Sequence, residues 1–186
     1  MIDIGKLQQL FPAIPLDENY LNKLMEAYPA LDERVYNMIF DLRKFIYVEK
    51  SRTPYLETIG ERVNKILREI RERKIKVEEA YQKLIQIVAE LDEIRERRKE
   101  LTDRELSIIL PLEKAVGKSP RLLNSVKALV DELQREGLLF TGWNLKTETT
   151  KKVGLKIRGL IRKQKLTFEE REQLFNEIMK NLTQVG

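Results

Sequence analysis

Apolar residues recur along most of this chain at intervals of three and four, the spacing that places side chains on one face of an α-helix. Glycine and proline, which interrupt helices, are scarce, with 8 and 6 among 186 residues. The pattern predicts an all-α protein whose N-terminal helices lie near 4–11, 17–28 and 31–49. In the third of these, the apolar stripe consists of Val35, Ile39, Leu42 and Ile46.

The two longest predicted helices follow in the middle of the chain. Thr53 and Pro54 supply an N-cap and a proline at the first helical position, so we expect a helix that begins there and extends to about residue 74. A turn at 74–76 separates it from a second helix near 77–100. Two helices of about 20 residues joined by a short turn predict a long antiparallel hairpin. Their apolar stripes are Leu56, Ile59, Val63, Ile66, Leu67 and Ile70, then Ala80, Leu84, Ile87, Leu91 and Ile94.

Local start and stop signals divide the rest of the chain into further helices. Thr102 and Thr167 are each followed three residues later by glutamate, the capping-box pattern of a helix start. Ser119-Pro120 is a second cap-plus-proline signal, and Gly137 has the place of the residue just after a helix end. We therefore expect a single helical domain over 1–186, a bundle built around the hairpin. Its parts are N-terminal helices in 1–50, the hairpin in 51–100, and C-terminal helices in 101–186 that include 148–164 and 168–182.

Composition removes several classes of function. The chain has no cysteine and no histidine, so disulfides, thiolate chemistry, the usual general base and the usual zinc ligand are all excluded. No apolar run approaches the roughly 20 residues that span a bilayer, and the N-terminal segment lacks the pattern of a signal peptide. We expect a cytoplasmic protein without membrane contact, which is not an enzyme and has no catalytic, cofactor-binding or metal site.

The sequence Gly117-Lys118-Ser119 matches the end of a phosphate-binding loop, which needs the pattern GxxxxGK[ST]. Leu112 occupies the position of the first glycine, and a helical pattern rather than a strand precedes the motif. We interpret the segment as a turn between two helices, with Ser119 as the cap.

Positive charge is concentrated in the segment 141–165. It contains eight lysines and arginines but only one acidic residue, Glu148, for a net charge of +7. The whole chain carries +5, so the remainder sums to −2. A local concentration of this kind is typical of a surface that meets a polyanion or an acidic protein.

Within this segment the predicted helix 148–164 has an apolar stripe, Val153, Ile157, Leu160 and Ile161, and cations over much of the remaining surface without carboxylates to neutralise them. Three interpretations stay open: a helix packed on its own domain with an idle basic surface, a binding surface for phosphate backbone or acidic protein, and attachment to a membrane surface. Trp143, the only tryptophan, either anchors a loop or stacks on a base. The candidate binding residues are Trp143, Lys146, Lys151, Lys152, Lys156, Arg158, Arg162 and Lys163.

The order of several short motifs resembles a known family. The sequence reads Glu61-Arg62-Val63 with Ile66-Leu67, then Glu78-Glu79-Ala80, then Leu101-Thr102 through Glu105-Leu106, and last Trp143 followed by Arg158 and Arg162. This succession is similar to the C-terminal helical region of type I restriction enzyme R subunits, and residues 7–48 resemble the helices before that hairpin. The chain departs from the family pattern at Lys76, where a capping serine or threonine is usual, and at Gly154 and Gly159, which soften the basic helix.

The resemblance implies a role in assembly. The full-length R subunit of the family is a nuclease and DNA translocase that uses ATP and magnesium, and no motif in this chain matches those parts. Its C-terminal region is implied to dock the subunit onto the methyltransferase and specificity subunits of the restriction–modification complex. We therefore hypothesise a non-catalytic assembly module whose basic residues meet an acidic partner face. The alternative is a helical DNA-binding module that contacts duplex DNA through 146–165.

Overall fold

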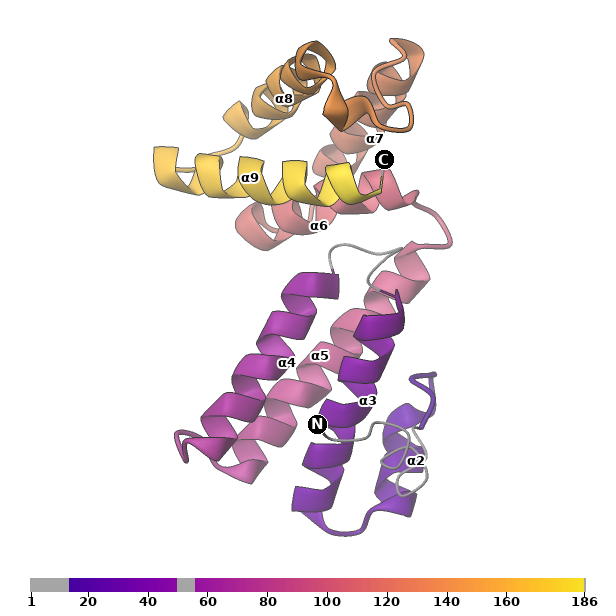
Figure 1. Cartoon of the computed structure of the whole chain (residues 1–186), viewed down its shortest axis with the longest axis vertical. Helices are drawn as coiled ribbons and strands as arrows, with labels where there is room; N and C mark the ends of the chain where they lie inside the picture. The colour runs from indigo at the N-terminus through magenta and orange to yellow at the C-terminus, as the bar shows by residue number, and fades with distance from the viewer. Residues whose placement is uncertain (1–13, 50–55, 186) are drawn as a thin grey trace. The chain divides into compact units, whose positions relative to one another are not determined.

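The computed structural model describes residues 14–49 and 56–185, and within these ranges the secondary structure is helical, with no strand (Figure 1). The prediction of an all-α protein is therefore confirmed. The predicted helix at 4–11 and the start signal at Thr53-Pro54 lie outside the described residues. The helices are α2 (Tyr20–Ala27), α3 (Leu31–Glu49), α4 (Leu56–Arg71), α5 (Val77–Arg97), α6 (Asp103–Val116), α7 (Pro120–Arg135), α8 (Thr147–Arg162) and α9 (Phe168–Gln184), with a 3₁₀ turn, η1 (Trp143–Leu145).

The capping signals act as expected at two helix starts. At α6 the amide of Glu105 donates to the Thr102 hydroxyl at 3.2 Å, and the Glu105 carboxylate accepts from the Thr102 amide at 2.7 Å. The same reciprocal pair, Thr167 and Glu170, begins α9. At α7, Pro120 takes the first helical position, but the Ser119 side chain accepts no hydrogen bond from the helix. Gly137 ends α7 in the left-handed region, with φ 65°.

The backbone clusters into two compact units, the first containing α2–α5 and the second α6–α9 with η1. In the first unit, α3 packs against both α4 and α5 (Figure 1). The apolar stripes proposed for these helices are buried almost completely, Leu67 and Ile70 being partly exposed. At the centre lie Val35, Leu42, Val63, Ala80 and Leu84, each with no exposed surface.

One polar pair is buried within this apolar core. Asp41 on α3 is only 5% exposed, and its carboxylate accepts a hydrogen bond of 3.0 Å from the Tyr20 hydroxyl on α2. Burial raises the pKa of Asp41 to about 6, against a smaller opposite effect of hydrogen bonds from Tyr20 and the Ile14 amide. Burial and the neighbouring Asp41 also raise the pKa of Tyr20. This pair joins α2 to α3.

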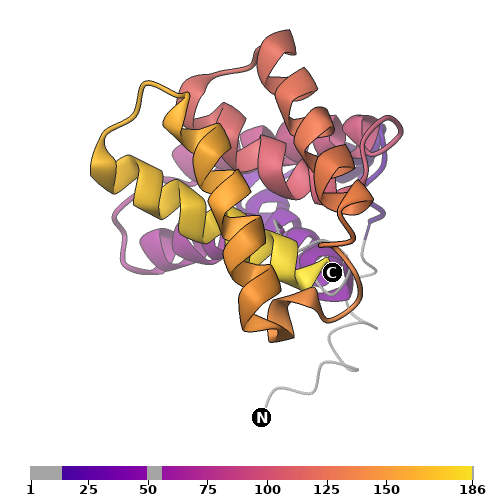
Figure 2. The ribbon, with the colours of Figure 1, turned by 90° about the horizontal axis from the view of Figure 1, so that it is seen from above.

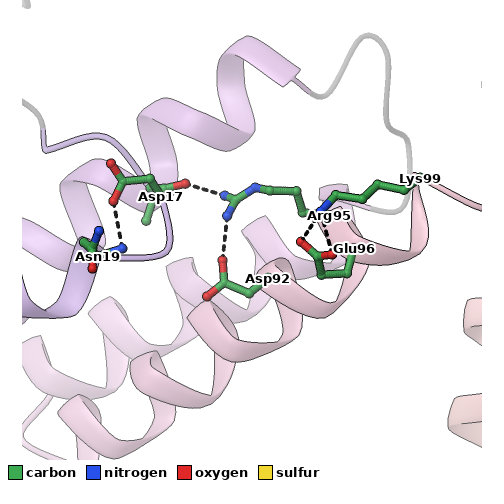
Figure 3. Close-up of polar contacts among 7 residues, drawn as sticks. Asp17, Asn19, Asp92, Arg95, Glu96 and Lys99 are labelled. Atoms are coloured by element: carbon green, nitrogen blue, oxygen red, sulfur yellow. Dashed lines mark hydrogen bonds and ion pairs between the residues drawn. The ribbon is translucent and has the colours of Figure 1, made fainter.

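The end of α5 holds the segment that leads into α2. The Arg95 guanidinium donates to the carbonyl oxygen of Leu16 and to the Asp92 carboxylate, the latter at 2.7 Å (Figure 3). In the same view, Lys99 pairs with Glu96 at 2.6 Å. Arg95, Arg97 and Lys99 thus each contact a carboxylate three or four residues earlier in the chain.

In the second unit, α6 is the central helix. It packs against α7 and α9, and α8 packs against α7, α9 and η1; Figure 2 shows α8 crossing α9. Leu106, Ile108, Ile109 and Leu112 of α6 have no exposed surface. Among the described residues, no helix has both the length and the apolar character needed to cross a bilayer.

Candidate interaction surface on helix α8

The loop that leads into α8 is built around the single tryptophan. Gly142 adopts φ 78°, a left-handed conformation that favours glycine, and η1 follows directly. Trp143 has no exposed surface, so its ring anchors the loop in the core and offers no face to a base or a partner. Its indole N–H finds no acceptor within the described part of the chain. Of the two interpretations of Trp143, the structure places it in the anchoring position.

The inner face of α8 is apolar and tightly packed. Val153, Ile157, Leu160 and Ile161, the predicted stripe, are all buried. Gly154 lies on the same face, where a Cβ would stand 3.3 Å from Cζ of Phe175 on α9. This glycine therefore permits a close approach of α8 to α9. Its role is in packing, whereas from the sequence we expected it only to soften the helix.

Lys156 lies at one edge of this inner face and is already paired. Its ammonium group donates to Glu132 at 2.6 Å and to Glu136 at 2.8 Å, both near the end of α7. The hydrogen bond from Glu132 raises the pKa of Lys156, and the same contact lowers the pKa of Glu132. The expectation that no carboxylate neutralises the cations of α8 is wrong at this position, because the acidic residues come from a helix 20 or more residues earlier.

Arg158 lies at the opposite edge and is also paired. Its guanidinium donates through both terminal nitrogens to the two oxygens of Glu172 on α9, one contact measuring 3.0 Å. It also lies over the Phe175 ring, 3.7 Å from the centroid. The hydrogen bond with Glu172 raises the pKa of Arg158 and lowers the pKa of Glu172. The expectation of an unneutralised cation is wrong here too.

The remaining cations of α8 point to solvent. Lys151, Lys152, Arg162 and Lys163 are exposed, and none pairs with a carboxylate within the described residues. At 100° per residue they fall on one side of the helix together with Leu155, Gly159 and Glu148. Leu155 is 69% exposed and gives this side of the helix one large apolar side chain. We call this surface the outward arc of α8: Glu148, Lys151, Lys152, Leu155, Gly159, Arg162 and Lys163.

Lys146 lies just before α8 and is set apart from the outward arc. Its ammonium group stands 4.9 Å from the centroid of the Phe140 ring, and the side chain is exposed. The eight candidate residues thus separate into a buried anchor (Trp143), two paired cations (Lys156 and Arg158), four cations on the outward arc, and Lys146, which lies apart from that arc.

The chemistry open to the outward arc is binding. It offers four positive charges around one apolar side chain, and it includes a single carboxylate. In the described parts of the chain, no three carboxylates come together as they would to hold a metal ion. Sequence reasoning did not single out Leu155, although its place opposite the apolar stripe of α8 was a usable signal.

Comparison with family models, with curated proteins and with solved structures gives no match for this chain.

Proposed function

We propose that this chain is a non-catalytic helical assembly module, which docks onto an acidic face of a partner protein through the outward arc of α8. The observation that supports it is the pairing pattern of the helix. Lys156 and Arg158 are satisfied by carboxylates of their own unit, whereas Lys151, Lys152 and Arg162 are exposed and unpaired. Charges of this kind accelerate association with an oppositely charged surface and favour the correct partner.

The apolar centre of the arc favours a protein partner over a phosphate backbone. Leu155 is largely exposed, and nothing lies within 4 Å of where a Cβ of Gly159 would be. A partner side chain can pack on Leu155, and the bare backbone at Gly159 permits close approach. Protein interfaces combine such an apolar centre with a polar rim, whereas contacts to DNA phosphates need only the cations.

The resemblance to the C-terminal region of type I restriction enzyme R subunits suggests which partner this is. On that basis we propose the methyltransferase and specificity subunits of a restriction–modification complex, in the cytoplasm, with ATP and magnesium used elsewhere in the full-length subunit. We further propose that α4 and α5 form the long antiparallel hairpin of that region. The ion pairs Arg62–Glu90 and Lys83–Glu69 support this, because the residue number falls along one helix as it rises along the other.

The proposal is tested by capture of the purified chain on the immobilised methyltransferase–specificity complex at about 0.1 M salt. The reversal variant Lys151→Glu, Lys152→Glu, Arg162→Glu should lose capture. A matched control, Arg43→Glu, Arg71→Glu, Lys76→Glu, makes the same change in charge at exposed positions of the first unit and should keep it.

A second variant separates protein docking from DNA binding. Leu155→Ala leaves every charge in place but removes the apolar centre, so capture should weaken while binding to duplex DNA stays the same. If the complex is not captured, and duplex DNA binds in a salt-dependent way that the reversal variant abolishes, the chain is a DNA-binding module and the docking proposal fails. Equal capture of the reversal variant and the control would also refute it.

A further inference from the structure

A pocket of about 580 Å³ opens in the second unit where three helix ends meet. The end of α6, the beginning of α7 and the end of α8 form its walls. The residues that matter for its chemistry are Gly117, Ser119, Arg121, Lys163, Gln164 and Lys165. Its volume lies in the range of about 300–1,000 Å³ that small-molecule sites occupy. Apart from Lys163, which belongs to both, the pocket is separate from the outward arc.

The charge of the pocket has one sign. Three of its residues, Arg121, Lys163 and Lys165, are cations, and no aspartate or glutamate is among the lining residues. None of the three forms an ion pair within the described parts of the chain. By contrast, Lys156 and Arg158 on α8, the helix that ends just before Lys163, are both paired. The nearby Glu132, whose pKa is lowered mainly by its hydrogen bond with Lys156 and slightly by Lys163, does not line the pocket. Three positive charges around one pocket that no carboxylate lines make a site for an anion.

The partial charges of the helix ends at the pocket leave its net charge positive. The α7 N-terminus contributes about half a positive charge, while the C-termini of α6 and α8 together contribute about one negative charge. The sum, about half a negative charge, is small beside three cations. At the α7 start, moreover, the Ser119 side chain accepts no hydrogen bond from the helix, and the first turn has no acidic residue. The Ser119 side chain is therefore not held against the helix amides, and its hydroxyl can turn toward a ligand and donate to it.

We propose that this pocket binds an oligophosphate, such as the di- or triphosphate chain of a nucleotide. One phosphate group carries at most about two negative charges, so three cations in a pocket of this size match a longer chain better than a single ion. The pocket is not a phosphate-binding loop, since Leu112 and a helix stand where that loop has a glycine and a strand. Side chains hold the phosphates: Arg121 from one wall, and Lys163 and Lys165 from the other.

The proposal is tested by isothermal titration of the full chain with inorganic triphosphate, in EDTA and about 50 mM salt, which leaves charge interactions strong. The pocket variant is Arg121→Gln, Lys163→Gln, Lys165→Gln. The matched control, Lys151→Gln, Lys152→Gln, Arg162→Gln, removes the same charge from the outward arc. We expect one site per chain and at least about tenfold weaker binding in the pocket variant only. Amide shifts in ¹H–¹⁵N spectra should concentrate at Gly117, Ser119 and 163–165.

The outcomes distinguish the ligand and the site. Tighter binding of ATP than of inorganic triphosphate identifies a nucleotide, and equal binding identifies the phosphate chain alone; both support the pocket. The pocket proposal would be overturned if the pocket variant and the control lost the same affinity for triphosphate, or if the wild type did not bind triphosphate at millimolar concentration. Because the partner-capture experiment uses the outward arc and leaves Arg121 and Lys165 intact, failure of one proposal does not imply failure of the other.

Discussion

Replacing Asp41 by asparagine should make the first unit more stable at neutral pH and less stable in acid. The carboxyl group is buried and its pKa is raised to about 6, whereas an unfolded aspartate titrates near 3.8. The folded state therefore binds the proton more tightly than the unfolded state. The stability contributed by this proton is fully present below pH 3.8 and is lost as the pH rises to 6. Above pH 6 the buried charge costs on the order of 3 kcal/mol, at 1.36 kcal/mol per pKa unit.

The substitution removes this cost and introduces a smaller one. The asparagine carbonyl can still accept from the Tyr20 hydroxyl. In the wild type the Ile14 backbone amide donates to the Asp41 carboxylate, whereas in the variant it would face the asparagine side-chain NH₂, which cannot accept. Loss of that hydrogen bond costs about 1 kcal/mol. The variant should be about 2 kcal/mol more stable than the wild type at pH 7.5 and about 1 kcal/mol less stable at pH 4, so the two stability curves cross in between.

The assay is urea unfolding followed by circular dichroism, at half-unit steps from pH 4 to 7.5. The difference between variant and wild type isolates Asp41, because all other titrating groups are common to both. Tyr20→Phe serves as a control, since it keeps the carboxyl group but removes its hydrogen-bond donor, and should move the transition to higher pH. Parallel curves for Asp41→Asn and wild type would refute the reasoning, as would a variant that is less stable at pH 7.5.

Three further predictions concern the second unit and are measured by thermal unfolding. Gly159→Ala should stabilise by about 0.5–1 kcal/mol, because this helical position is open and alanine loses less backbone entropy on folding. Gly154→Ala in the same helix should give no such gain, because its Cβ would press on Phe175 at 3.3 Å; equal gains at the two sites would contradict the close packing of α8 on α9. Trp143→Ala should lower the free energy of unfolding by about 3–5 kcal/mol, because it truncates a large buried side chain. Trp143→Phe should lower it much less, because the buried indole N–H has no acceptor to lose. Similar losses of stability in both variants would show that the N–H is hydrogen-bonded in solution. Thr102→Ala should cost about 1 kcal/mol through loss of the capping box, and Ser119→Ala should cost almost nothing because Ser119 makes no cap hydrogen bond; a larger loss at Ser119 would refute the difference between the two helix starts.

The capping motifs and apolar spacings in the sequence correctly predicted local structure. The capping boxes at Thr102 and Thr167, the turn at Gly137 and the apolar stripes of α3, α4, α5 and α8 are all present in the structure. Each depends on residues within about one or two helical turns of one another, so the sequence alone contains the information. The helices' existence and their buried faces follow from spacing, because a helix repeats every 3.6 residues wherever it later packs.

The sequence predicted the candidate surface on α8 only approximately. A concentration of positive charge in 141–165 is visible in the sequence, but which cations meet a partner is not. Lys156 and Arg158 are paired because α7 and α9 bring Glu132, Glu136 and Glu172 beside them. These partners lie 14–24 residues away, and periodicity does not say which faces of two helices will meet.

What the sequence by itself determined is therefore the class of structure, the approximate positions of the described helices and the location of the charge, all set by short-range chemistry. Only the tertiary structure decided that Trp143 is enclosed, that Asp41 is buried beside Tyr20, and that Arg121 meets Lys163 and Lys165 around one pocket. These features depend on how helices pack, and packing sums many weak contacts over residues distant in sequence. Packing therefore determines which charged side chains are available to a partner, because residues from other helices either neutralise a charge or leave it exposed.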